Sequence, residues 1–225
     1  SEGDSCFACG VSLVIHPRSP MVPTCHANFR YFEMYNSAGE KIDSWFGGGS
    51  DLTPYYLFEE DASHFHRVQK EAADKHGAEL YPLYKKQCDE YFRNHHRNEG
   101  RGIGGTFYDY LKANEERSEE DWFAFSQSMG NSFLPSYLPI VEKRKDLEYT
   151  KEQRYWQELR RGRYVEFNLV HDRGTLFGLK TNGRTESILM SLPPRVRWDY
   201  NVEPEASSPE AKLIAVLKEP IDWIN

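Results

Sequence analysis

Three consecutive glycines constrain this chain more than any other feature of its sequence. The glycines at positions 47–49 lie in the run Trp45–Tyr56, between two aromatic residues and a single carboxylate, Asp51. Glycine loses more conformational entropy on folding than any other residue and brings no side chain to pack. The run therefore predicts a loop that another group approaches closely, with Asp51 at its mouth. An ordinary glycine-rich connection, in which Asp51 caps the next segment, is the alternative interpretation.

The composition limits the functions open to the chain. Its 225 residues predict one domain, and its net charge of −7, from 28 basic and 35 acidic residues, argues against a nucleic-acid binder. Aromatic residues make up 14% of the chain, which suits an aromatic core and also a pocket for a large flat ligand. No apolar run reaches membrane length and no charged-then-apolar leader is visible, so no integral membrane segment is expected.

The four cysteines predict free thiols in a reducing compartment. Cys6 and Cys9 form a C-x-x-C pair, but no second pair accompanies it, so a zinc site is not expected. Cys25 and Cys88 stand alone in the sequence. Disulfides would be expected only in an oxidising compartment.

Alternation of residue types predicts strands near the N-terminus, over Val11–His16 and Cys25–Tyr35, with Ile42–Phe46 as a hairpin partner. In the second strand the period of two places His26, Asn28 and Arg30 on one face. Three polar side chains in a row on one face indicate either a solvent-exposed surface or the lining of a site.

Helical spacing and capping signals follow in the middle of the chain, and strand signals return after them. Helices are predicted over 62–72 (ended by Gly77), 81–95, 118–133 (closed by Pro135), 150–162 and 209–223, with capping boxes at Ser118 and Thr150. Strands are predicted over 163–170, 175–181 and 184–192, as a meander with turns at 172–174 and at Asn182-Gly183. Strands, helices and then hairpin-linked strands predict an α+β fold on an antiparallel sheet.

Arginines crowd these segments in a chain that is acidic overall. They are Arg30, Arg97, Arg101, Arg160, Arg161, Arg163 and Arg184. Because the guanidinium fork matches carboxylates and phosphates, several converging arginines indicate a polyanionic ligand, and surface ion pairs are the alternative. Arg30 is the best functional candidate, since it shares a strand face with His26 and Asn28. The residues thus indicate an enzyme or a binder for a large, flat, multiply carboxylated ligand.

Several motifs, in order along the chain, resemble the oxygen-dependent coproporphyrinogen III oxidase family. They are Gly10–Pro17, Trp45–Tyr56, Arg101–Gly105, Gly162–Asn168 and Thr185–Pro193, and the resemblance covers the chain from Gly10 to its C-terminus. It implies a large antiparallel sheet flanked by helices on both faces, and a homodimer. The implied reaction is oxidative decarboxylation of two propionates of coproporphyrinogen III to vinyl groups, giving protoporphyrinogen IX in haem synthesis. Molecular oxygen is the implied co-substrate, with no obligatory cofactor.

The resemblance also implies site residues, carried over by motif position. The proton donor falls on His26, the central aspartate on Asp51, and the group that holds the reacting propionate on Arg30. The implied substrate contacts are Ser12, Asn28, Phe29, Arg30, Asn182, Gly183 and Arg184.

A divalent metal site is attributed to four histidines in bacterial members of the family. By motif position these are His16, His26, His66 and His96. The spacing of these histidines shows no zinc motif, and a single histidine is more often a structural residue than a ligand.

Two further expectations follow from the resemblance. Family members carry an additional N-terminal region before the Gly10 motif, which we expect this sequence to lack. The cytoplasm is the expected compartment, with the mitochondrial intermembrane space as the alternative. A non-catalytic tetrapyrrole binder and a metal-dependent dioxygenase are the competing functional hypotheses.

Overall fold

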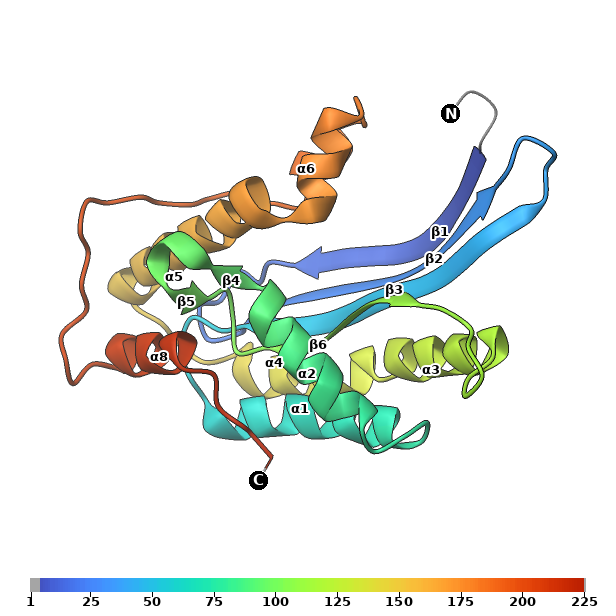
Figure 1. The fold of residues 1–225 in the computed structure, drawn as a ribbon. Helices are drawn as coiled ribbons and strands as arrows, with labels where there is room; N and C mark the ends of the chain where they lie inside the picture. The colour runs from blue at the N-terminus through green and yellow to red at the C-terminus, as the bar shows by residue number, and fades with distance from the viewer. Residues whose placement is uncertain (1–4, 225) are drawn as a thin grey trace.

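The computed structural model describes residues 5–224, and its centre is a four-stranded antiparallel sheet (Figure 1). The strands lie in the order β1-β2-β3-β6, and their bounds are Ser5–Ile15 for β1, Thr24–Tyr35 for β2, Lys41–Thr53 for β3 and Gly105–Leu111 for β6. A turn that includes Gly39, with φ of 80°, joins β2 to β3. The predicted N-terminal strands and their hairpin are therefore confirmed.

The glycine run is not the predicted loop, because it lies inside β3 and pairs with a strand on each side. A Cβ at Gly48 would lie 2.7 Å from the main-chain oxygen of Asn28, and one at Gly49 only 2.1 Å from that of Thr106. Gly49 also has a φ of 154°, which residues other than glycine rarely adopt. The glycines let the neighbouring strands approach β3 closely, so the signal for close approach was right and the signal for a loop was wrong.

Four helices cover one face of the sheet (Figure 1). They are α1 (Glu59–Asp74), α2 (Leu80–Tyr91), α3 (Glu119–Asn131) and α4 (Phe133–Arg144). A hydrophobic cluster lies between them and the sheet, with Phe46 and Tyr108 from the strands against Tyr84, Phe125 and Met129 from the helices. This burial of apolar surface is the main stabilising contribution to the fold.

Helix starts follow the predicted capping boxes more closely than helix ends follow the predicted stops. Ser118 and Asp121 cap α3 reciprocally, and the Oγ of Ser208 accepts from the main-chain N–H of Ala211 at the start of α8 (Pro209–Lys218). The observed ends differ from the predicted ones. Helix α2 stops at Tyr91, and α8 stops two residues before Pro220. Helix α3 ends before a new helix that contains Pro135 in its first turn. Proline is tolerated in a first turn, where its missing N–H has no helical partner.

The second side of the sheet carries helices where the sequence predicted a strand meander. Helix α5 (Lys151–Glu166), opened by the predicted capping box at Thr150, runs through Gly162. A π-helical turn (Phe167–His171) follows it, and then α6 (Arg173–Lys180) and α7 (Thr185–Leu189). The predicted strands over 163–192 are therefore wrong.

The residues that signalled hairpin turns serve the helices instead. Asp172 caps α6 by accepting the Thr175 main-chain N–H at 2.7 Å, and Asn182, with φ of 54°, turns the chain between α6 and α7. Gly162 lies within α5, and only glycine fits there because a Cβ would lie 2.6 Å from the main-chain oxygen of Arg197. The α+β architecture, with helices on both sides of the sheet (Figure 1), is confirmed.

All four cysteines are free, as predicted. Cys6 and Cys9 lie three residues apart on β1, so their side chains point to opposite faces of the sheet. Of the helices in residues 5–224, none has the length and apolar character needed to cross a membrane.

Replacing Phe125 by alanine tests whether the helix-covered face is the main core. The Phe125 side chain is fully buried, so we expect Phe125→Ala to lower the free energy of unfolding by about 3–5 kcal/mol, measured by urea denaturation. Phe123→Ala is the matched control, because Phe123 lies on the same helix with 52% of its surface exposed, and we expect a change within about 0.5 kcal/mol. Equal losses in both variants would contradict this assignment.

Candidate active site

Three polar side chains that contact one another in series lie at one end of the sheet, at the face that α1–α4 leave uncovered. His26 on β2 and Asp51 on β3 are direct cross-strand partners, and His26 Nδ1 lies 2.8 Å from Asp51 Oδ1. The second carboxylate oxygen accepts a 2.6 Å hydrogen bond from the Arg101 guanidinium. The Asp51 carboxylate can only accept a hydrogen bond, so a neutral His26 carries its proton on Nδ1 and donates it to Asp51. The other ring nitrogen, Nε2, is then left as an acceptor.

Arg101 is buried in an aromatic cage that isolates its ion pair with Asp51 from water. Its guanidinium carbon lies 3.9 Å from the ring centroid of Phe92 and 4.8 Å from the centroids of Tyr164 and Phe167. Burial would by itself raise the pKa of Asp51, but the Arg101 charge and the His26 hydrogen bond outweigh it and hold the pKa below its ordinary value. Asp51 is therefore a buried carboxylate that is negatively charged at neutral pH, next to a partly exposed imidazole.

The polar row predicted on β2 extends away from this end of the sheet. Asn28 and Arg30 follow His26 on the same face, and Ser12 lies opposite Asn28 on β1. Arg30 spans the sheet to form a 2.9 Å ion pair with Asp109 on β6. The distance along β3 from Asp51 to Gly47, the partner of Arg30, is about 13 Å.

Phe29 lies on the opposite face from this row. Its ring packs against the hydrophobic cluster under α3, close to Gly130. A ligand on the face of His26 can therefore meet Phe29 only through its main chain.

The predicted contacts Asn182, Gly183 and Arg184 lie between α6 and α7, separate from the row on the sheet. The main-chain N–H of Gly183 donates to the Gly178 carbonyl at 2.8 Å, and all three residues are exposed. Within residues 5–224, no hydrogen bond or ion pair joins them to β1, β2 or β3.

The four histidines of the predicted metal site do not converge. His16 lies 2.8 Å from the Ser191 carbonyl oxygen and His66 lies 2.8 Å from the Tyr81 hydroxyl, each through a ring nitrogen. Burial lowers the pKa of both His16 and His66 to about 4, so both rings are neutral. His96 is bound to Glu166 and His171 instead.

No three His, Cys, Asp or Glu side chains in the described part of the chain gather to hold a metal ion. A shared site needs ligands that converge at about 2 Å from one ion. The four histidines therefore do not fit a common metal, and only His26 belongs to the polar row.

Three residues of the site escaped the sequence-based site prediction. Arg101 was noted among the arginines but not as the partner of Asp51, and Asp109 and Tyr164 were not singled out. The one signal for Arg101 was an arginine between two glycines, Gly100 and Gly102, where the backbone passes close to other chain segments.

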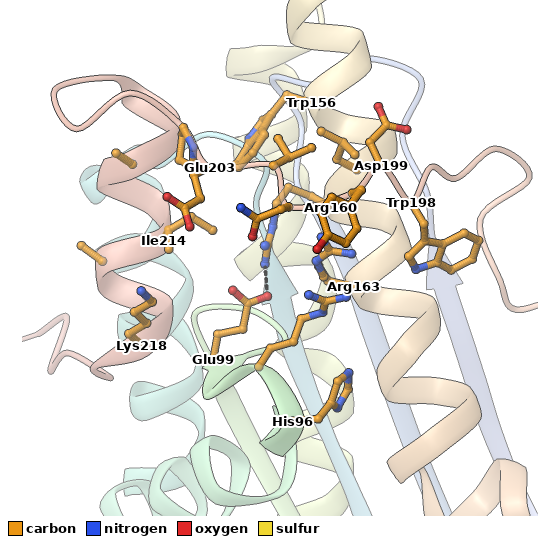
Figure 2. Close-up of a pocket in the computed structure, with 18 of the residues that line it drawn as sticks. His96, Glu99, Trp156, Arg160, Arg163, Trp198, Asp199, Glu203, Ile214 and Lys218 are labelled. Carbon is orange, nitrogen blue, oxygen red and sulfur yellow. Dashed lines mark hydrogen bonds and ion pairs between the residues drawn. The ribbon is translucent and has the colours of Figure 1, made fainter.

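A hollow between helices lies away from this chemistry. It encloses about 1010 Å³ between α5, α8 and residues 198–204, where Glu99 binds Arg160 at 2.9 Å (Figure 2). Neither His26, Asp51 nor Arg30 lines it. A second hollow of about 580 Å³ adjoins the polar row, since Asp109, Phe107, Tyr91 and Arg173 line it. We therefore place the candidate site on the sheet face.

Comparison with known proteins decides the family. The family model described as coproporphyrinogen III oxidase matches residues 1–223. The chain belongs to this family. It is 58% identical over 219 residues to the Drosophila melanogaster protein named oxygen-dependent coproporphyrinogen-III oxidase. That alignment covers 97% of this chain and 55% of the relative, so the chain spans about half the length of the curated relative it matches.

Removing Arg101 tests the charge balance around Asp51. In Arg101→Met, burial is no longer offset by a cation, so we expect the pKa of Asp51 to rise and the free energy of unfolding to fall by about 3–5 kcal/mol at pH 7. The double variant Asp51→Asn/Arg101→Met, which buries no charge, is expected to recover much of this loss. Urea denaturation measures both.

The pH dependence of this variant follows from the direction of the shift. A depressed pKa in the native protein gives stability that is lost as pH falls below 3.8, the ordinary value of aspartate. With the pKa raised, the native state of Arg101→Met binds the extra proton, so the contribution of Asp51 to stability should rise as pH falls from 7 towards 4. The unfolding free energy of the variant should therefore fall less over this interval than that of the unaltered chain. An unchanged pH profile would contradict the assigned role of Arg101.

The buried histidines give a second pH-dependent expectation. His16 and His66 have native pKa values of about 4 against 6.5 in the unfolded chain, so the unfolded state takes up protons first. Their stabilising contribution is complete above pH 6.5 and is lost as pH falls to 4, at about 2–3 kcal/mol for each histidine. In His66→Gln, the fall in unfolding free energy over this interval should be smaller. A metal bound by these histidines would instead make stability sensitive to EDTA.

Proposed function

We propose that this chain catalyses the oxygen-dependent oxidative decarboxylation of coproporphyrinogen III to protoporphyrinogen IX. The observation that carries the proposal is the buried Asp51–Arg101 pair beside His26, on the same sheet face as Arg30. Family membership and the name of the Drosophila relative support the substrate and the use of oxygen. Arg30 on this face could bind a propionate of a tetrapyrrole, whereas Arg97, Arg160 and Arg163 are ion-paired with Glu166 or Glu99 elsewhere.

Each of the two reactions balances with one oxygen molecule. The propionate carbon next to the pyrrole ring loses a hydrogen with its two electrons, and the bond to the carboxylate breaks. That bond's electron pair becomes the C=C bond of the vinyl group, and carbon dioxide leaves. Oxygen takes up the two electrons, the hydrogen and one further proton, which gives hydrogen peroxide.

The residues of the chain would bind the substrate, orient it and handle its protons. Asp51, ionised because Arg101 and His26 lower its pKa, would accept hydrogen bonds from pyrrole N–H groups and favour their deprotonation. His26 presents Nε2 as the group that donates or accepts a proton. Arg30, 39% exposed, would bind the propionate that reacts.

Polar groups along β1 and β2 would fix the substrate between these two ends. Ser12 and Asn28 lie side by side in the row between His26 and Arg30. Asn182, Gly183 and Arg184 would contribute only if α6 and α7 approach the sheet face. The histidines do not fit a common metal, so no step of this mechanism involves one.

An assay started without oxygen tests the proposal. After coproporphyrinogen III is mixed with the chain and air is admitted, protoporphyrin fluorescence should rise, at a rate that EDTA does not change. We expect Asp51→Asn to lower kcat/KM by about 100-fold or more. Asp43→Asn, which removes the same charge at a surface ion pair with Lys112, should retain full activity.

The outcomes separate this proposal from its alternative. More than half of the turnover remaining in Asp51→Asn would contradict the role of the carboxylate, provided that near-ultraviolet circular dichroism shows a native fold. Tight binding of coproporphyrinogen III without oxygen-dependent product would favour the tetrapyrrole-binding hypothesis.

We extend the proposal to a homodimer. Large apolar side chains stand exposed on and beside α6 and α7, among them Phe177 at 69% and Met190 at 79%. Apolar surface of this kind is typical of interfaces between protein chains. Sedimentation velocity of the purified chain measures the oligomeric state.

A further inference from the structure

The ion pair between Arg30 and Asp109 crosses the sheet over a glycine. Arg30 lies on β2 and Asp109 on β6, and β3 runs between these strands with Gly47 directly opposite Arg30. A Cβ at Gly47 would lie 2.7 Å from Asp109 Oδ1 and 3.0 Å from Arg30 Nε. The two side chains therefore meet in space that only a glycine leaves free.

Asp109 is held between two arginines, beside a hollow. Its Oδ1 lies 2.9 Å from the Arg30 guanidinium and its Oδ2 lies 3.7 Å from that of Arg173. Arg173 in turn lies over the ring of Tyr91, which stacks on Phe107 at 4.4 Å. All of these residues except Arg30 line the hollow of about 580 Å³. The carboxylate is thus fixed in a partly buried place at the edge of the candidate site.

A propionate and an aspartate side chain present the same group to a guanidinium. Besides Asp109, Arg30 donates only a long hydrogen bond of 3.4 Å, to Asn28 Oδ1, within the described residues. A substrate propionate that approaches Arg30 therefore competes with Asp109 for the same donors. Arg30 is exposed enough to exchange one carboxylate for the other.

We propose that Asp109 is a specificity-determining residue that occupies Arg30 as a placeholder until a substrate propionate displaces it. This inference rests on the proposed function. Displacement of Asp109 costs the free energy of the Arg30–Asp109 ion pair. Only a ligand that brings its own carboxylate to Arg30 can compensate for this cost. A tetrapyrrole that carries a vinyl group there leaves the pair intact.

The placeholder also affects the reaction itself. As carbon dioxide forms, the reacting carboxylate loses its negative charge, so Arg30 holds the ground state more strongly than the transition state. Asp109 opposes this effect, because it offers Arg30 another carboxylate as the first one disappears. After the step, Arg30 is paired with Asp109 again and no longer binds the product at this position.

Porphyrin binding tests the proposal without turnover. The probes are coproporphyrin III, the oxidised fluorescent form that keeps all four propionates, and protoporphyrin IX, which keeps two. In Asp109→Asn we expect the Kd of coproporphyrin III to fall by about 2- to 5-fold, the coupling of one partly exposed ion pair, and the Kd of protoporphyrin IX to stay unchanged. Asp109→Glu, which keeps the charge, and the control Asp43→Asn should match the unaltered chain.

Turnover gives a readout that a structural role would not produce. We expect KM and kcat of Asp109→Asn to fall together, each by about 2- to 5-fold, with kcat/KM nearly unchanged. A residue that merely supports the fold would lower kcat/KM when it is replaced.

Three results would overturn the inference. They are weaker or unchanged binding of coproporphyrin III by Asp109→Asn, equal tightening for both porphyrins, and a loss of kcat/KM. If the unaltered chain gives no oxygen-dependent product from coproporphyrinogen III, the proposed function itself fails and this inference fails with it. If the unaltered chain binds coproporphyrin III and only the variant departs from expectation, the proposed function stands.

Discussion

The buried ion pair between Asp51 and Arg101 is the interaction on which the site depends. Either charge alone in that position would be strongly destabilising, because each is almost completely removed from water. Together, and with His26 and three aromatic rings around them, they form a neutral unit that fixes parts of the chain far apart in sequence. Strand β3, the segment before β6 and the end of α5 must all be in place before it exists.

This arrangement joins stability to chemistry in one contact. The Arg101 charge that makes burial of Asp51 tolerable also keeps the carboxylate ionised, which is the form that its proposed role requires. The aromatic cage excludes water from the Arg101 side, and the His26 side stays partly open. A ligand can therefore reach this unit from the His26 side, where 23% of the side chain is exposed, while the Asp51 side chain is only 2% exposed.

Local signals in the sequence predicted those features that depend on neighbouring residues. The period of two placed His26, Asn28 and Arg30 on one face, and the capping boxes at Ser118 and Thr150 begin helices as expected. The strand prediction for residues 163–192 failed because aspartate and asparagine-glycine occur at the ends of helices as well as in hairpin turns. The sequence alone cannot show which role they take, since that depends on what packs against the segment. Likewise, glycines signal close approach in a loop and in a strand, and only the partner strands decide between them.

Strand β1 has consequences for how this surface can grow. Within residues 5–224 it pairs with β2 alone, so the main-chain N–H and C=O groups along its other side are available to a further strand. A strand added there would turn Ser12 from a residue at the rim of the polar face into one near its middle. The width of the platform offered to a ligand is thus set by what lies next to β1, while the reactive groups stay fixed on β2 and β3.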